Sequence, residues 1–129
     1  MKFEKYDEWN IRKKVLAVKD NNLYAHEREI FWCSLGCNIG VETNGSGDYF
    51  ERPVIIMKVY NNQSALILPI TSKNKADRFH FKISVKNKDA WVKVTQARTV
   101  STLRLRKKIE YLHKETFSKL YCVWKQHVK

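Results

Sequence analysis

Hydrophobic and polar positions alternate in the central part of the chain. In residues 78–85, apolar side chains alternate with polar ones, which predicts a strand with one buried and one exposed face. Other short apolar runs, separated by turn-forming residues, span 29–35, 52–60, 64–70 and 90–96. Because short connections join antiparallel strands, this part of the chain is predicted to form a small β-barrel or a strongly bent sheet.

The pattern changes to a helical period at both ends of the chain. Residues 5–19 predict a helix with Asp7 as its N-cap. The apolar side of this helix is predicted to consist of Ile11, Val15, Leu16 and Val18. Near the C-terminus, apolar residues recur with the spacing of an amphipathic helix at Phe117, Leu120, Tyr121, Trp124 and Val128. This second helix is predicted to pack on the barrel or on a second subunit, and the fold is predicted to be mainly β with a helix at each end.

Length and composition are those of one folded unit. The chain has 129 residues, of which 43% are hydrophobic, enough for one domain, 1–129, with a single core. No apolar run approaches the ~18 residues of a membrane span. The first residues carry acids where a signal peptide needs an apolar stretch. We therefore expect a cytoplasmic protein without a membrane role.

The charge of the chain is strongly unbalanced. Lysine and arginine total 25 against 13 aspartates and glutamates, which gives a formal net charge of +12. Such a charge predicts a polyanionic partner. RNA, DNA and an acidic protein all fit, and charge alone does not choose among them.

The cysteines and histidines do not have the spacing of a metal site. Cys33, Cys37 and Cys122 are an odd number, which favours reduced, mostly buried thiols. The spacing between Cys33 and Cys37 is wider than the usual two-residue gap of zinc ligands, and no histidine pair accompanies it. We predict no metal and no cofactor.

Four segments, taken in chain order, resemble the signature blocks of the PemK/MazF family of toxin endoribonucleases. They are GCNIGVE, ERPVIIM, LPITSK and VTQARTVSTLRLRKKI. With the first strand they define an expected toxin core at 28–125, and residues 1–25, with their DEWN, resemble a family branch that carries an N-terminal helical extension. The resemblance implies a small SH3-like β-barrel with a C-terminal helix that works as a homodimer. It also implies cleavage of single-stranded RNA and silencing by a cognate acidic antitoxin.

The resemblance assigns catalytic roles to Arg52 and Thr71. Arg52, in ERPV, corresponds to the family's catalytic arginine, and its planar fork suits two phosphate oxygens in a transition state. Pro53 restricts Arg52 to an extended backbone. Thr71 corresponds to the family's catalytic threonine, and with Ser72 it offers hydroxyls to a phosphate at the end of a strand. A simple turn-forming Thr-Ser pair is the structural alternative.

Glu42 is the third candidate catalytic residue. It lies in NIGVE and matches an acidic position that is frequent in the family. It could orient Arg52, accept hydrogen bonds from a base or act in proton transfer. A plain solvated acid fits the sequence equally well.

Candidate RNA-binding residues surround the catalytic ones. Lys93, Gln96 and Arg98 combine a charge for phosphates with hydrogen-bonding groups for unstacked base edges, and Ser72 and Lys73 adjoin Thr71. Arg98 fits a packing role as well as an RNA contact.

Two positions depart from the PemK branch of the family. Thr95 stands where that branch has an acid, and Val41 stands where it has a histidine. The group that accepts the 2′-hydroxyl proton is therefore unidentified. For His80 the pattern favours an ordinary exposed strand histidine over a catalytic one.

The predicted reaction is metal-independent cleavage by attack of the neighbouring 2′-hydroxyl on the phosphate. Two other functions fit the same fold. One is a non-catalytic toxin like the CcdB gyrase poisons, and the other is a nucleic-acid-binding module that has lost its activity.

Overall fold

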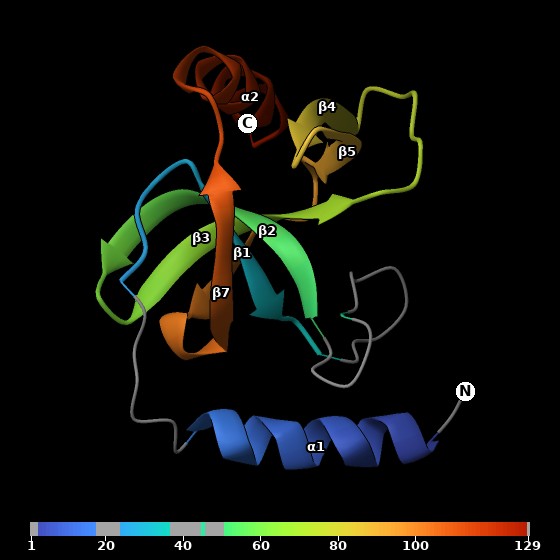
Figure 1. The fold of residues 1–129 in the computed structure, drawn as a ribbon, viewed down its shortest axis with the longest axis vertical. Helices are drawn as coiled ribbons and strands as arrows, with labels where there is room; N and C mark the ends of the chain where they lie inside the picture. The colour runs from blue at the N-terminus through green and yellow to red at the C-terminus, as the bar shows by residue number, and fades with distance from the viewer. Residues whose placement is uncertain (1–2, 18–23, 37–44, 46–50, 129) are drawn as a thin grey trace.

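The computed structural model describes residues 3–17, 24–36, 45 and 51–128. In these residues a seven-stranded sheet lies between an N-terminal and a C-terminal helix at opposite ends of the molecule (Figure 1). The elements in chain order are α1 (Phe3–Ala17), β1 (Glu29–Ser34), β2 (Glu51–Asn61), β3 (Ser64–Thr71), β4 (His80–Val85), β5 (Lys88–Lys93), β6 (Arg98–Ser101), a short 3₁₀ helix η1 (Thr102–Arg104), β7 (Leu105–Tyr111) and α2 (Lys114–His127). Within the described residues, neither helix is long and apolar enough to span a bilayer.

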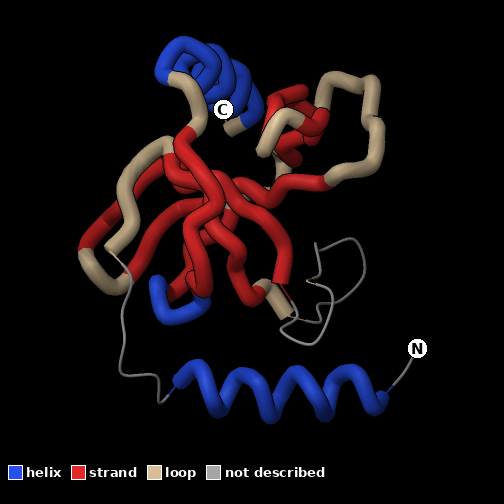
Figure 2. Tube along the Cα trace, in the orientation of Figure 1, coloured by secondary structure: helices blue, strands red, loops and turns tan. Residues whose placement is uncertain are grey.

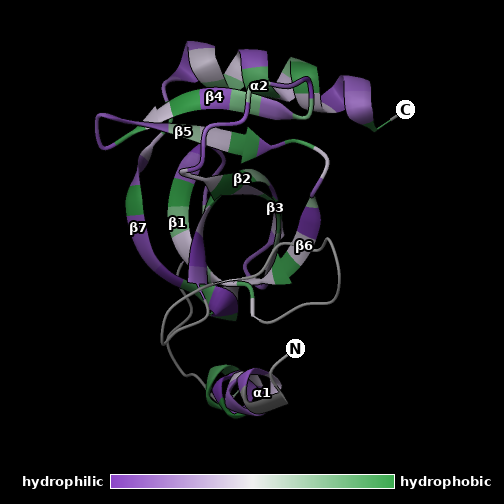
Figure 3. Cartoon of the chain, turned by 90° about the vertical axis from the view of Figure 1, so that its right-hand side faces the viewer, coloured by the Kyte–Doolittle hydropathy of each residue, from purple (hydrophilic) through white to green (hydrophobic). Residues whose placement is uncertain are grey.

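The sheet is antiparallel throughout and strongly bent. Its strand order is β4-β5-β3-β2-β1-β7, and β6 also pairs with β3. One edge of β3 is shared, because residues 64–67 pair with β6 while Ile70 and Thr71 pair with β5. Viewed from the side, the strands follow a ring (Figure 3). Among the described strands no ladder joins β4 to β7, so the barrel stays open there. The predicted mainly β, barrel-like fold with a helix at each end is confirmed.

The two faces of the bent sheet bury separate sets of side chains. Along β2, Val54 and Ile56 belong to the inner set, while Ile55 and Met57 belong to the outer set, and all four are fully buried. This strict alternation is the period-two pattern of a strand covered on both faces. Further members of the inner set are Phe31, Cys33, Leu35, Ala65, Ile67, Val100 and Leu105.

Helix α2 covers the outer set and lies against β4 (Figure 2). Phe117 and Leu120 are buried, and Tyr121 and Trp124 pack on the same cluster. The predicted amphipathic stripe is thus buried against the sheet of its own chain. Val128 follows the helix and is 58% exposed, so it does not extend the stripe.

Helix α1 buries only part of the predicted apolar side. It begins at Phe3, so Asp7 lies inside the helix and is not its N-cap. Leu16 is buried as predicted, but Ile11 and Val15 are 64% and 51% exposed, and Trp9 is buried in addition. Val18 lies outside the described residues.

The reason is the surface that Trp9 contacts. Gly36 has a φ of +91°, and a Cβ at this position would lie 2.1 Å from Cε2 of Trp9, so the indole needs a glycine here. The guanidinium of Arg104 also lies over the indole ring, 5.5 Å from its centroid. This aromatic anchor sets the orientation of the helix more strongly than the aliphatic residues do.

Two strands of the sheet, β6 and β7, were not predicted from the pattern. β7 contains the sequence LRKKIEY, in which basic side chains are exposed and only Leu105 is fully buried. Because β7 pairs with β1 alone in the described sheet, one of its sides faces solvent, and its sequence has little apolar alternation that could predict a strand. The predicted strand 78–85 begins at His80 in the structure, and Phe79 is 41% exposed in the preceding turn.

An ion pair between a buried carboxylate and an exposed lysine joins β1 to β7. Glu29 is 1% exposed, accepts a hydrogen bond from Lys108 Nζ at 2.8 Å and accepts another from the backbone N–H of His26. Burial alone would raise the pKa of Glu29, but the hydrogen bonds from Lys108 and His26 and the charge of Lys108 together lower it below its ordinary value. Glu29 therefore stabilises the fold when ionised.

We expect Glu29→Gln to lower the free energy of unfolding by about 1–3 kcal/mol at pH 7. Because the folded pKa is depressed, the stabilisation is present above the ordinary pKa of 4.5 and is lost as the pH falls through the folded pKa. The difference between variant and wild type should thus shrink in acid. Urea unfolding at pH 7 and pH 4 measures both effects.

The matched control for this prediction is Asp89→Asn. Asp89 pairs with Lys82 at 3.6 Å, and both side chains are more than 60% exposed. This control should lower the free energy of unfolding by no more than about 0.5 kcal/mol. Equal losses in the two variants would contradict a special role for the buried carboxylate of Glu29.

Candidate functional site

The register of the sheet places Arg52 and Thr71 on neighbouring strands at the same end. Arg52 is the second residue of β2, and Thr71 is the last residue of β3. Val54 pairs with Pro69, so the same register continued by two residues places Arg52 opposite Thr71. Side chains that face each other across antiparallel strands point to the same side of the sheet. The two predicted catalytic residues are therefore neighbours on one face.

Lys93 joins them on this face. Thr71 pairs with Trp91 of β5, and Lys93 lies two residues after Trp91, so it points to the same side. Lys73 and Lys75 follow β3 directly. Burial lowers the pKa of Lys93, and the positive charges of Arg52, Lys75 and Lys73 lower it further. Three cations therefore lie close enough to Lys93 to repel its charge, an arrangement that a bound polyanion relieves.

Arg52 is half-buried at the start of β2. Burial lowers its pKa. A guanidinium ordinarily titrates so far above neutral pH that Arg52 keeps its charge at pH 7. Its side chain extends from a strand residue followed by Pro53, as the sequence predicts.

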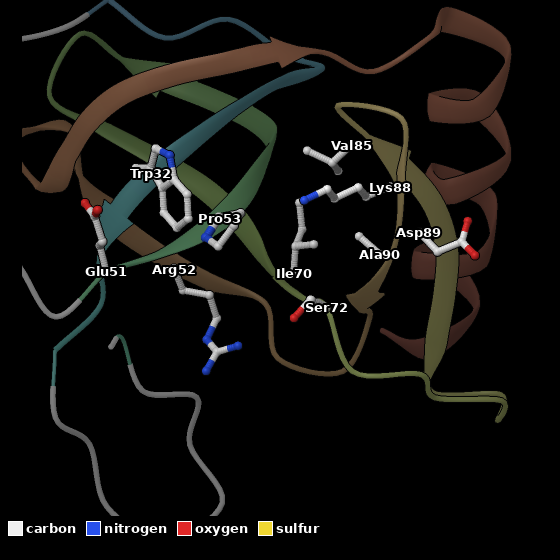
Figure 4. Close-up of a pocket in the computed structure, with 10 residues that line it drawn as sticks. All are labelled: Trp32, Glu51, Arg52, Pro53, Ile70, Ser72, Val85, Lys88, Asp89 and Ala90. Carbon is white, nitrogen blue, oxygen red and sulfur yellow. The ribbon is translucent and has the colours of Figure 1, made fainter. Parts of the chain in front are cut away.

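A pocket of about 290 Å³ opens beside Arg52. Trp32, Pro53 and Ile70 form apolar walls, and Ser72 stands at the edge with its hydroxyl on the side that faces Arg52 (Figure 4). The arrangement places a cation and a hydroxyl at the mouth of an apolar recess, which suits a phosphate with an attached base.

The hydroxyl of Thr71 has a structural partner. Thr71 is 5% exposed, and its Oγ1 accepts a hydrogen bond from the backbone N–H of Lys73 at 3.2 Å. This bond shapes the turn that presents Ser72 and Lys73, which is the turn-forming role predicted as the alternative. A hydroxyl that accepts one hydrogen bond still has its own proton to donate, so both roles fit the same side chain.

The other predicted residues lie in different settings. Arg98 Nη1 donates a hydrogen bond to the backbone carbonyl of Leu35 at 3.3 Å, so the packing alternative describes this residue in the structure. Gln96 is half-buried in the turn after β5, where its backbone N–H binds the carbonyl of Lys93 at 3.2 Å. Glu42 lies outside the described residues.

His80 is not the exposed strand histidine that the pattern favours. Its side chain is only 15% exposed, and its Nδ1 lies 2.7 Å from Oδ1 of Asp77. The turn before β4 folds this carboxylate onto the imidazole, a contact three residues away that strand alternation does not predict.

The cysteines have different environments. In the described part of the chain, Cys33 is a buried free thiol, as predicted for most of the thiols, and Cys122 is an exposed free thiol. Cys37 lies outside the described residues. No group of three histidine, cysteine or acidic side chains with metal-binding geometry occurs among the residues that the structure describes.

The sequence matches one protein family over most of its length. The model for PemK-like, MazF-like toxins of type II toxin-antitoxin systems covers residues 26–123. The chain belongs to this family. In this PemK-like toxin the matched segment contains the whole sheet and most of α2, while α1 lies before it.

Solved structures of MazF-like toxins share the fold. A MazF from Deinococcus radiodurans superposes with a TM-score of 0.69 at 14% identity over 81% of this chain and 96% of its own. The Mycobacterium tuberculosis toxin MazF-mt6 gives 0.60 at 17% identity over 78% and 95% of the two chains. A mycobacterial endoribonuclease in complex with its cognate antitoxin gives 0.61 at 13% identity over 81% and 94%. No curated protein matches the chain at a significant level.

Sequence interpretation of this PemK-like toxin missed two aromatic residues at the site. Trp91 lies in the row between Thr71 and Lys82, and Trp32 lines the pocket beside Arg52. Both lie within predicted strands, but only the pairing of β3 with β5 and of β1 with β2 brings them to the site. The strand sequences carry no signal for that pairing.

Proposed function

We propose that this toxin is an endoribonuclease that cleaves single-stranded RNA. The observation that carries the proposal is the convergence of Arg52, Lys93, Lys73 and Lys75 beside the hydroxyls at the end of β3. Such a cluster serves a substrate that brings several negative charges into a small volume. Family membership and the endoribonuclease among the similar folds support the same reaction class.

Arg52 has the role of stabilising the transition state. Cleavage passes through a crowded phosphorane that carries more negative charge than the phosphate, and a rigid guanidinium binds two of its oxygens at once. Lys93 and Lys73 add charge around the same phosphate. Thr71 and Ser72 orient the phosphate through their hydroxyls.

The substrate supplies the nucleophile in this reaction. The 2′-hydroxyl next to the scissile phosphate loses its proton and attacks phosphorus, the bond to the 5′-oxygen breaks, and a 2′,3′-cyclic phosphate and a 5′-hydroxyl form. The described cations provide the charge stabilisation, and the proposal includes no metal or cofactor. The apolar pocket at Trp32 and Pro53 receives an unstacked base beside the cut.

Two protein partners complete the proposal. We expect a homodimer, because the family pairs small barrels and a second copy would extend the basic surface. We also expect a cognate acidic antitoxin, because a net charge of +12 attracts carboxylates as well as phosphates. A disordered acidic segment that covers the four-cation cluster would block RNA access. We expect the toxin to act on RNA in the cytoplasm.

The direct test is incubation of the purified full chain with a long single-stranded RNA. Discrete fragments with cyclic phosphate ends are expected, and their end sequences give the cleavage motif. Salt-sensitive RNA binding without any cleavage would favour the module without activity. Inhibition of purified gyrase with no effect on RNA would favour the CcdB-like alternative.

A further inference from the structure

The proposed reaction needs a group that takes the 2′-hydroxyl proton, and the structure offers one that the family resemblance does not supply. We infer that His80 is the general base of RNA cleavage and that Asp77 is its positioning residue. This inference rests on the proposed function, since it assigns a further catalytic residue to the same site.

The first observation is the position of His80 in the sheet. His80 of β4 pairs directly with Lys93 of β5, so the two side chains point to the same face. Lys93 lies two residues from Trp91, which pairs with Thr71. His80 therefore shares a face with Lys93, Thr71 and, by continuation of the register, Arg52.

The second observation is the distance across that face. Thr71 and His80 are separated by two strand spacings across the sheet and two residues along it, which corresponds to about 12 Å between their Cα atoms. Lys93 and Trp91 of β5 both lie between them. One phosphate held over Lys93, together with its ribose, spans such a gap when a threonine hydroxyl and an imidazole reach toward it from the two sides.

The third observation is the contact between Asp77 and His80. Asp77 Oδ1 lies 2.7 Å from Nδ1 of the imidazole and also accepts the backbone N–H of Phe79 at 2.9 Å, which fixes the carboxylate. The hydrogen bond with His80 is the main reason that the pKa of Asp77 is lowered, so this group is an ionised acceptor at neutral pH. A carboxylate only accepts hydrogen bonds, so Nδ1 carries the proton and Nε2 has the lone pair that a base needs.

The imidazole also has access to a ligand. His80 lines a surface pocket of about 550 Å³ together with Asn74 and Trp91. The charged groups around it on the neighbouring elements are Lys75, Asp77, Arg78, Lys82, Asp89 and Lys93. The surrounding cations attract the phosphate, and the carboxylate of Asp77 holds the imidazole in one orientation.

The proton balance of the step is complete. Nε2 of His80 takes the proton of the 2′-hydroxyl, the 2′-oxygen forms a bond to phosphorus, and the bond to the 5′-oxygen breaks. The 5′-oxygen takes a proton from solvent, and the imidazolium returns its proton to solvent. No oxidant, reductant or further reactant is needed.

The test compares RNA cleavage by wild type, His80→Gln, His80→Ala and Asp77→Asn. His80→Gln should lower kcat by about 10²-fold or more with little change in KM. The wild-type cleavage rate should rise with pH as the imidazole loses its proton. This rise, the acid limb of the pH profile, should be absent from His80→Gln. Asp77→Asn should move the limb to lower pH, because the carboxylate favours the protonated imidazole. Added imidazole should restore part of the activity of His80→Ala.

The matched control is His26→Gln. The His26 side chain is 71% exposed, and its Nδ1 lies 3.3 Å from Oε1 of Glu29, outside the candidate site. The hydrogen bond from the backbone N–H of His26 to Glu29 is kept in this variant. The control should keep the wild-type rate and pH profile. If wild type cleaves RNA and folded His80→Gln keeps the rate and the acid limb, the assignment of His80 is wrong while the proposed function stands. If wild type cleaves no RNA under any condition, both fail.

Discussion

Replacement of Arg52 by alanine is expected to reduce RNA cleavage by about 10³-fold while the protein stays folded. The guanidinium is the group at this site that can hold two oxygens of the phosphorane with fixed geometry, and its loss removes stabilisation that exists mainly in the transition state. The fold should survive, because the buried part of β2 begins at Val54, beyond Arg52. Cleavage rates with saturating RNA measure the effect, and circular dichroism checks the fold.

Two further variants give this experiment its controls. Arg52→Lys keeps the charge without the planar fork and should recover only a small part of the activity. Lys107→Ala removes one positive charge from an exposed position on β7. Its cleavage rate should stay within about 2-fold of wild type, because this variant loses only long-range attraction for RNA. A folded Arg52→Ala protein with the wild-type rate would remove Arg52 from the site.

The second large effect is expected from the substrate. Replacing the ribose on the 5′ side of the scissile phosphate by deoxyribose should abolish cleavage, because the attacking hydroxyl is then absent. Binding should persist, since the proposed phosphate contacts of Arg52, Lys93 and Lys73 do not involve that hydroxyl. The cleavage products of the unmodified RNA should carry 2′,3′-cyclic phosphates, which mass spectrometry detects.

Excess EDTA provides the second part of this test. The proposed site stabilises charge with its own cations, so the chelator should leave the rate unchanged. Cleavage of the deoxyribose substrate at the wild-type rate would contradict attack by the 2′-hydroxyl. Activity that EDTA removes and magnesium restores would show a reaction that depends on a metal ion.

The sequence predicts the strands of this fold better than it predicts their partners. Residues 52–60 and 64–70 are recognisable because both faces of β2 and β3 are buried and the runs are almost wholly apolar. β7 is not recognisable in the same way, since its basic side chains face solvent on a strand that pairs on one side. The hydrophobic pattern of a sequence indicates which side chains are buried. An exposed edge strand buries few side chains, so its pattern is weak.

The same distinction applies to the residues of the candidate site: some can be predicted from the sequence, and others depend on how the strands pair. Arg52 and Thr71 could be chosen from the sequence because short blocks around them resemble a family. The inclusion of Lys75 and His80 depends on which strands are adjacent, and register is a property of the folded chain. The burial of Trp9 on α1 was missed for a related reason, because Gly36, which receives Trp9, is distant in sequence.

The basic character of β7 also bears on how separate molecules meet. The strand order ends at β7, and an unpaired strand edge is a template on which another chain can add and begin an aggregate. Arg106, Lys107 and Lys108 follow one another along this strand. Arg106 and Lys108 are held by Glu51 and Glu29, so the row of charge is fixed in place. Charged side chains held along an edge strand disfavour the addition of a second strand, so we expect this edge to protect molecules of the toxin from joining edge to edge when many copies are present.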